Sequence, residues 1–84
     1  MAKYRKKPVV IEAVQYTGDN YADILEFIGE KSGHWQEEGN KIVIYTLEGK
    51  HDANVNDFII RGVKNEFYPC KPDIFELTYE KVEE

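Results

Sequence analysis

The chain has 84 residues, which suffices for a single domain spanning residues 1–84, because a chain this short buries only about 60 to 65% of its extended surface. Hydrophobic residues make up 42% of it and aromatic residues 13%, a composition that argues against a disordered chain. The formal net charge of -5 argues against general nucleic-acid binding, which depends on an excess of Lys and Arg.

The two ends of the chain carry opposite charges. Two interpretations are open: a solvated arm and a solvated helix face that lie near each other, or a basic arm that contacts the phosphates of a ligand. The basic residues are Lys3, Arg5, Lys6 and Lys7, and the acidic ones are Asp73, Glu76, Glu80, Glu83 and Glu84.

Residues 8–16, PVVIEAVQY, are rich in β-branched side chains and predict a strand. Apolar residues fall on both of its faces, which indicates a strand covered on both sides or one that carries a bulge. A helix is expected to follow, because Asn20 is a good N-cap residue and Asp23 stands at the spacing of a capping box.

Four apolar side chains recur at steps of three and four residues after Asn20, so they share one helix face that is expected to pack on the sheet. Either Gly29 or Gly33 is expected to end this helix, since glycine accepts the left-handed conformation just beyond a C-terminus. The four residues are Tyr21, Ile24, Leu25 and Ile28.

Residues 33–40, GHWQEEGN, predict a loop or a short irregular strand. Residues 41–47 predict a strand, with a turn at Glu48-Gly49 and a returning strand at 50–53.

The stretch from Asp57 to Tyr79 predicts a second hairpin followed by a helix. Its strand is expected at 58–63, a two-residue turn at Lys64-Asn65, and a return at 66–68 that ends at Pro69. Pro72 near the first helical position and an acidic residue in the first turn predict the C-terminal helix.

These elements predict an α+β fold: a small curved antiparallel sheet or open barrel of about five strands, with one helix packed across it and a C-terminal helix. The C-terminal helix is expected to pack on the sheet or on a second subunit. Self-association into a homo-oligomer is expected because so small a core gains from it.

Two segments resemble a known family: YRKKPVVIEAVQY at 4–16, and TLEG at 46–49 followed by DFIIRGVKNEFYPCKPDIFELTYEKV at 57–82. They resemble a widespread group of small proteins encoded by tailed phages and prophages. The positions of Asn56 and Asn65 are commonly glycine in that group, and asparagine tolerates a positive φ there. The resemblance implies a phage or prophage origin and a host-cytoplasmic setting, and it supplies no catalytic residue.

Candidate chemistry for an enzyme is sparse. His34 and His51 are the only histidines and Cys70 is the only cysteine, so neither a metal site nor a disulfide is expected. A Cys70 nucleophile paired with a histidine is the alternative to a structural cysteine. We expect no enzyme activity and no cofactor, and the short apolar runs predict neither a signal peptide nor a membrane span.

Basic and aromatic residues are interleaved at the N-terminus and around the second hairpin. Cationic groups bind phosphate and aromatic rings stack on bases, so this mixture suits a nucleotide; otherwise the rings belong to the core or its rim and the lysines are solvated. The candidate ligand-binding residues are Tyr4, Arg5, Lys7, Trp35, Arg61, Lys64, Tyr68 and Lys71.

Two functions therefore compete. The first is a phage counter-defence protein that sequesters a nucleotide immune signal, such as a cyclic oligonucleotide, in a pocket between subunits. The second is a protein-binding inhibitor or adaptor that acts on a host enzyme through the acidic C-terminal helix or the Trp35 loop. The net charge favours the second function, and the basic and aromatic residues favour the first.

Overall fold

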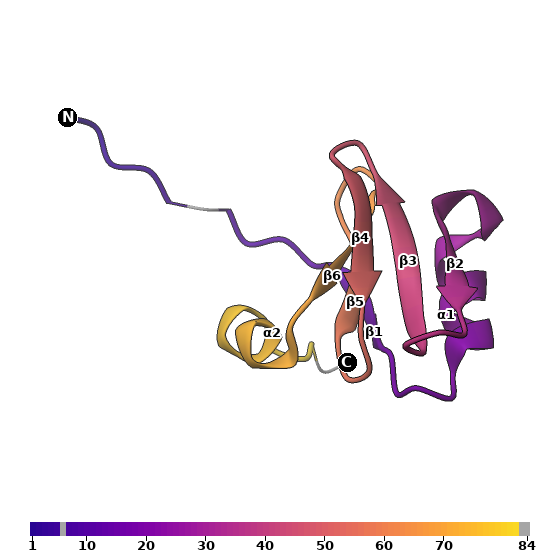
Figure 1. Cartoon of the computed structure of the whole chain (residues 1–84). Coiled ribbons are helices and arrows are strands. Elements are labelled where there is room, and N and C mark those ends of the chain that lie inside the picture. Colours follow the sequence, from indigo (N-terminus) through magenta and orange to yellow (C-terminus); the bar gives the residue numbers. More distant parts are fainter. Residues whose placement is uncertain (6, 83–84) are drawn as a thin grey trace.

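The computed structural model describes residues 1–5 and 7–82; the charged residues Lys6, Glu83 and Glu84 lie outside this range. An N-terminal arm (residues 1–5 and 7–11) precedes the first strand (Figure 1). The elements are β1 (Glu12–Gln15), α1 (Tyr21–Ile28), a 3-10 turn η1 (Glu30–Ser32), β2 (Gly33–Gln36), β3 (Lys41–Thr46), β4 (Gly49–Ala53), β5 (Phe58–Arg61), β6 (Phe67–Cys70) and α2 (Pro72–Thr78).

The predicted α+β class with two helices is confirmed. The strands form two antiparallel three-stranded sheets, ordered β1-β5-β6 and β2-β3-β4, instead of the single sheet that was expected, and in the described part of the chain they do not close into a barrel. The division occurs at the connection 54–57, where the Asp57 N–H donates to the Asn54 carbonyl (3.0 Å) and Asn56 has φ 81°. This tight turn carries the chain from one sheet to the other.

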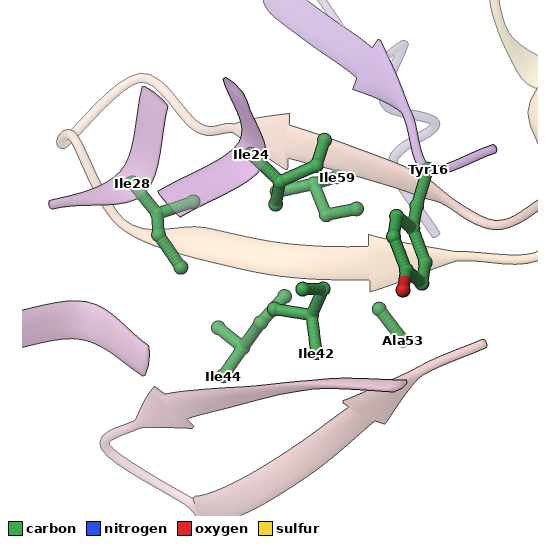
Figure 2. Close-up of a cluster of buried hydrophobic side chains, with 7 residues drawn as sticks. All are labelled: Tyr16, Ile24, Ile28, Ile42, Ile44, Ala53 and Ile59. Carbon is green, nitrogen blue, oxygen red and sulfur yellow. The ribbon is translucent and has the colours of Figure 1, made fainter. Parts of the chain in front are cut away.

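The core lies between the two sheets and α1. Figure 2 shows buried side chains converging from β3, β4, β5 and α1, with Tyr16 at one end of the cluster. Burial of such apolar side chains supplies the main stabilisation of the fold. The buried residues are Tyr16, Ile24, Ile28, Ile42, Ile44, Ala53 and Ile59.

Helix α1 begins after Asn20 and ends at Gly29, which has φ 85° and whose N–H donates to the Leu25 carbonyl. The predicted capping box is wrong, because the Asn20 side chain makes no cap hydrogen bond. Its Oδ1 instead accepts from the Thr17 N–H, and its Nδ2 donates to the Gln15 carbonyl, each at 2.9 Å. Asn20 therefore ties the helix start to β1.

Two strand limits differ from the prediction because of their neighbours. β1 begins at Glu12 rather than at residue 8. Glu12 lies opposite Arg61, the last residue of the partner strand β5, so residues 8–11 have no strand beside them in the described chain. Pro69 lies inside β6 rather than ending it. β6 is an edge strand, where a missing N–H is tolerated.

The β3–β4 turn is shifted by one residue from its predicted position, and the β5–β6 loop contains the predicted Lys64-Asn65 but is longer than two residues. The β3–β4 turn consists of Leu47 and Glu48, and the strand β4 opens with Gly49 at φ 117°. The β5–β6 loop is longer: the Gly62 carbonyl accepts from the Asn65 N–H, and Asn65 has φ 62°. Residues 63–65 thus form a three-residue hairpin loop whose last residue, Asn65, is left-handed. The prediction that asparagine tolerates a positive φ at this position is confirmed.

Helix α2 begins with Pro72 as its first residue, as predicted. It packs on the β1-β5-β6 sheet through Phe75, whose ring stacks on Phe58 with centroids 3.8 Å apart and planes 4° apart. Register places Phe58 and Ile60 on the face toward α2 and Ile59 on the face toward the core.

Candidate binding site

The hairpin turns β3–β4 and β5–β6 lie at the same end of the molecule (Figure 1). Between them and β6 is an open cleft of about 650 Å³, a volume within the range of small-ligand and peptide sites. Its lining combines aromatic rings, two carboxylates and small polar groups. The lining includes Tyr45, Glu48, His51, Glu66, Phe67 and Tyr68.

The cleft is acidic rather than basic. Glu48 contributes a carboxylate from the β3–β4 turn and Glu66 one from the end of the β5–β6 loop, and neither forms an ion pair within the described chain. None of the described lining residues is a lysine or an arginine. The site therefore suits an apolar or cationic group better than a phosphate.

Tyr45 is held at the rim of the cleft by its neighbours. Its hydroxyl is hydrogen-bonded to Nδ1 of His34 on the adjacent strand, and the Nζ of Lys50 lies 5.7 Å from the centre of its ring. These contacts fix the ring before any ligand binds, which lowers the entropy lost on binding.

Arg61 belongs to the structure of the sheet rather than to the cleft. Its guanidinium donates to Oε1 of Glu12 (3.1 Å) and to the Phe27 carbonyl (3.4 Å). It also lies over the rings of Phe27 and Phe67, 5.0 and 5.5 Å from their centroids. A guanidinium held by these groups is not free to bind phosphate.

Lys71 is also engaged, at the opposite end of β5. Its Nζ donates to Oδ2 of Asp57 (3.2 Å), and the same oxygen accepts from the Asn54 N–H (2.9 Å). Asp57 is only 3% exposed, so this carboxylate is stabilised by both donors.

Trp35 packs at the rim of the core, which was the alternative to a base-stacking role for this ring. Its ring stacks on Tyr21 with centroids 4.3 Å apart, and its Nε1 donates to Oδ1 of Asn40 (2.9 Å). Oδ1 of Asn40 also accepts from the Tyr16 hydroxyl (2.6 Å), and Nδ2 donates to the Gly18 carbonyl (2.9 Å). Asn40 therefore joins three segments, a role that the sequence did not indicate.

Tyr68 is the one predicted ligand-binding residue that lines the cleft. It lies opposite Ile60, on the face of β6 that looks toward α2, whereas Arg61 projects from the other face. Burial of Tyr68, together with the neighbouring Tyr79 hydroxyl, raises its pKa to about 12. Its ring is therefore neutral at physiological pH.

The other predicted residues do not gather at one place. Lys64 is exposed in the β5–β6 loop, next to the lining residue Asn65. Tyr4, Arg5 and Lys7 are exposed in the N-terminal arm, which Figure 1 shows extending away from the body. The predicted phosphate cluster of Arg61, Lys64, Tyr68 and Lys71 is thus divided between two sheet faces and two ends of the hairpin.

Cys70 is half-buried at the end of β6. Burial, followed by the nearby carboxylates of Asp57 and Asp73, raises the pKa of its thiol and lowers its reactivity. The described residues contain no group of three or more His, Cys, Asp and Glu side chains arranged to hold a metal ion. Within the same residues, both helices are too short to span a bilayer.

Comparison of the chain with known proteins identifies no related protein. The chain matches no family model, and neither the curated proteins nor the solved structures give a significant match.

Proposed function

We propose that this chain is a non-catalytic, phage-encoded binding protein that holds an exposed segment of a host protein in the cleft and so acts as an inhibitor or adaptor in the host cytoplasm. The observation that carries the proposal is the cleft lining, which includes the aromatic residues Tyr45, Phe67 and Tyr68 together with the acidic residues Glu48 and Glu66. The resemblance to phage and prophage proteins supports the phage origin.

The lining defines the chemistry of the segment. Tyr45 and Phe67 offer apolar ring surface, and the two carboxylates accept hydrogen bonds from a lysine or an arginine. The preferred ligand is therefore a peptide segment with one bulky apolar side chain and one basic side chain close to it. A polyphosphate would meet two negative charges and no cation in the lining.

The same residues support the non-catalytic part of the proposal. A cysteine nucleophile requires a lowered pKa, whereas the pKa of Cys70 is raised and Cys70 is not among the residues that line the cleft. His51 lines the cleft, with Ile44 opposite it in the hairpin. The side chains that line the cleft therefore suit binding of a ligand better than cleavage of a bond in it.

Selection from a displayed library of random peptides tests the proposal. The peptides that bind should share an apolar residue near a Lys or Arg, and calorimetry should give binding on the order of ten-fold weaker for the Glu48→Gln, Glu66→Gln double variant. The control is Glu37→Gln with Glu38→Gln, which removes the same charge from the exposed β2–β3 turn. Equal weakening in both variants, or no selected peptide, would overturn the proposal.

A second candidate function is sequestration of a nucleotide in a pocket between subunits. It is favoured by the aromatic rings of the cleft together with two cations close to it, Lys64 in the adjoining loop and Lys50 over Tyr45. The phosphates would have to be neutralised by these lysines or by a second copy of the chain.

Nucleotide binding is tested separately by thermal shift with cyclic di- and trinucleotides, and by the 260 nm absorbance released from the purified, denatured protein. A nucleotide that binds should raise the melting temperature as its excess grows, and Lys50→Ala with Lys64→Ala should remove the effect. Unchanged melting with every nucleotide rules this candidate out.

A further inference from the structure

The N-terminal arm is an extended, exposed segment with a mixed apolar and basic surface. Tyr4 is 94% exposed, Val10 77% and Val9 48%. Within the described part of the chain, no hydrogen bond or ion pair joins the arm to the body. Figure 1 shows the arm pointing away from the two sheets. A monomer thus leaves apolar side chains in water without a partner surface.

The sequence of the arm keeps it extended. Proline at position 8 fixes φ near -65°, and the β-branched residues at 9–11 favour extended backbone. Residues 8–11 therefore favour an extended backbone, and Figure 1 shows the arm reaching away from the body of the molecule.

Helix α2 presents a complementary surface. Phe75 and Tyr79 lie one turn apart and Phe75 stacks on the sheet, so the opposite side of the helix faces solvent. On that side Leu77 is 88% exposed and Ile74 53% exposed. On the helix the exposed carboxylates of Asp73 and Glu76 lie near Leu77, and Glu80 follows just beyond the helix end, where it borders the same surface hollow as Leu77.

Charge decides which surfaces of two copies meet. Two arms that paired with each other would bring Lys3, Arg5 and Lys7 against the same residues of the second copy, and like charges repel. An arm placed on α2 instead brings these cations against carboxylates and brings Val9 and Val10 close to exposed apolar side chains. The second arrangement is favourable in both charge and apolar contact.

We propose that the chain forms a symmetric dimer in which the arm of each copy lies on the outer surface of α2 of the other. The same contact occurs twice and closes the assembly, as in most homodimers. The contact is small, so dissociation constants on the order of 10 micromolar are expected at low salt. No described residue of the arm or of α2 lines the cleft, so dimerisation and peptide binding are tested independently.

A charge-swap experiment tests the dimer by sedimentation equilibrium in 50 mM NaCl. The arm variant is Arg5→Glu with Lys7→Glu, and the helix variant is Glu76→Lys with Glu80→Lys. Each alone places like charges in the contact and is expected to associate at least ten-fold more weakly than the wild type. An equimolar mixture of the two places opposite charges in both contacts and should restore the dimer.

The matched control is Lys31→Glu with Lys50→Glu, which changes the net charge as much as the arm variant does but lies outside the contact, and it should dimerise like the wild type. Circular dichroism melts verify folding, and Leu77→Ser tests the apolar part of the contact at an exposed position. A monomeric wild type overturns the proposal. So does a mixture that stays monomeric, which is the result expected if each arm binds the helix of its own chain.

Discussion

The two ends of the strand layers differ in how their polar side chains are used. At one end, which we call the closed end, Asn40 and Asp57 bind groups from distant parts of the chain. At the other, the open end, the two hairpin turns surround the cleft, and Glu48 and Glu66 have no ion-pair partner in the described chain. The polar residues of the closed end therefore hold the fold together. At the open end, Oε1 of Glu66 accepts only a long hydrogen bond from the Lys64 N–H (3.5 Å) and the Glu48 carboxylate has no partner in the described chain, so both carboxylates can still accept from a ligand.

A matched pair of asparagines gives the largest expected difference between the ends. Asn40 and Asn65 both have positive φ, 47° and 62°, so glycine removes no favourable backbone conformation at either position. Asn40→Gly loses three hydrogen bonds and leaves the Tyr16 hydroxyl and the Trp35 N–H without their partner, which should lower the free energy of unfolding by about 2 to 4 kcal/mol.

Asn65→Gly should change the free energy of unfolding by less than about 0.5 kcal/mol, because this exposed side chain forms no hydrogen bond within the described chain. Urea unfolding followed by circular dichroism measures both values. Equal losses for the two variants would remove the distinction between the ends.

A carboxylate pair sharpens the same comparison. Asp57→Asn weakens the bonds to Lys71 and to the Asn54 N–H at a buried site, and should cost about 1 to 3 kcal/mol. Glu66→Gln at the cleft should cost less than about 0.5 kcal/mol. Denaturant midpoints at constant m-value test this, and a larger loss for Glu66→Gln would assign that residue a structural role.

Arg61 is an exception, since it is a structural residue close to the open end. Arg61→Ala removes its contacts with Glu12, Phe27 and Phe67 and should lower the free energy of unfolding by about 1 to 2 kcal/mol. Lys64→Ala, in the exposed loop, should be nearly neutral. If Arg61→Ala leaves thermal stability unchanged, the structural assignment of Arg61 is wrong.

The high-pH titration of Tyr68 provides a comparison that is confined to alkaline solution. Its pKa is raised from 10 to about 12 in the folded state, so the unfolded chain loses this proton first as the pH rises. The contribution of Tyr68 to stability is therefore complete below pH 10 and declines between pH 10 and about 12. Urea unfolding at several pH values should show a shallower decline in Tyr68→Phe than in the wild type. A decline of the same steepness contradicts the assignment.

Sequence reasoning succeeded where the cause is local. The apolar face of α1, the glycine at its end, the strand at 41–46 and the proline at the start of α2 depend on residues within one or two turns of each other. It failed where the role of a residue depends on a partner that is distant in the sequence. The sequence predicts Arg61 and Lys71 as ligand-binding residues, but both bind carboxylates of the chain itself, up to 49 residues away in the sequence.

The same cause explains the missed features of the closed end. Asn40 lies in a turn that sequence alone describes as polar, while its partners Tyr16 and Gly18 belong to another segment. β1 is shorter than its strand-forming sequence because β5, its neighbour, ends at Arg61. The cleft was also not predictable, because it depends on the positions of two turns in different sheets.

The most direct test of the central claim is amide chemical-shift mapping with the tightest selected peptide. The perturbed amides should lie in the two turns of the open end, at residues 46–48 and 65–68, whereas those at 54–57 of the closed end should stay unchanged. Perturbations centred on the closed end, or spread over α2 without any in the two turns, would contradict this claim.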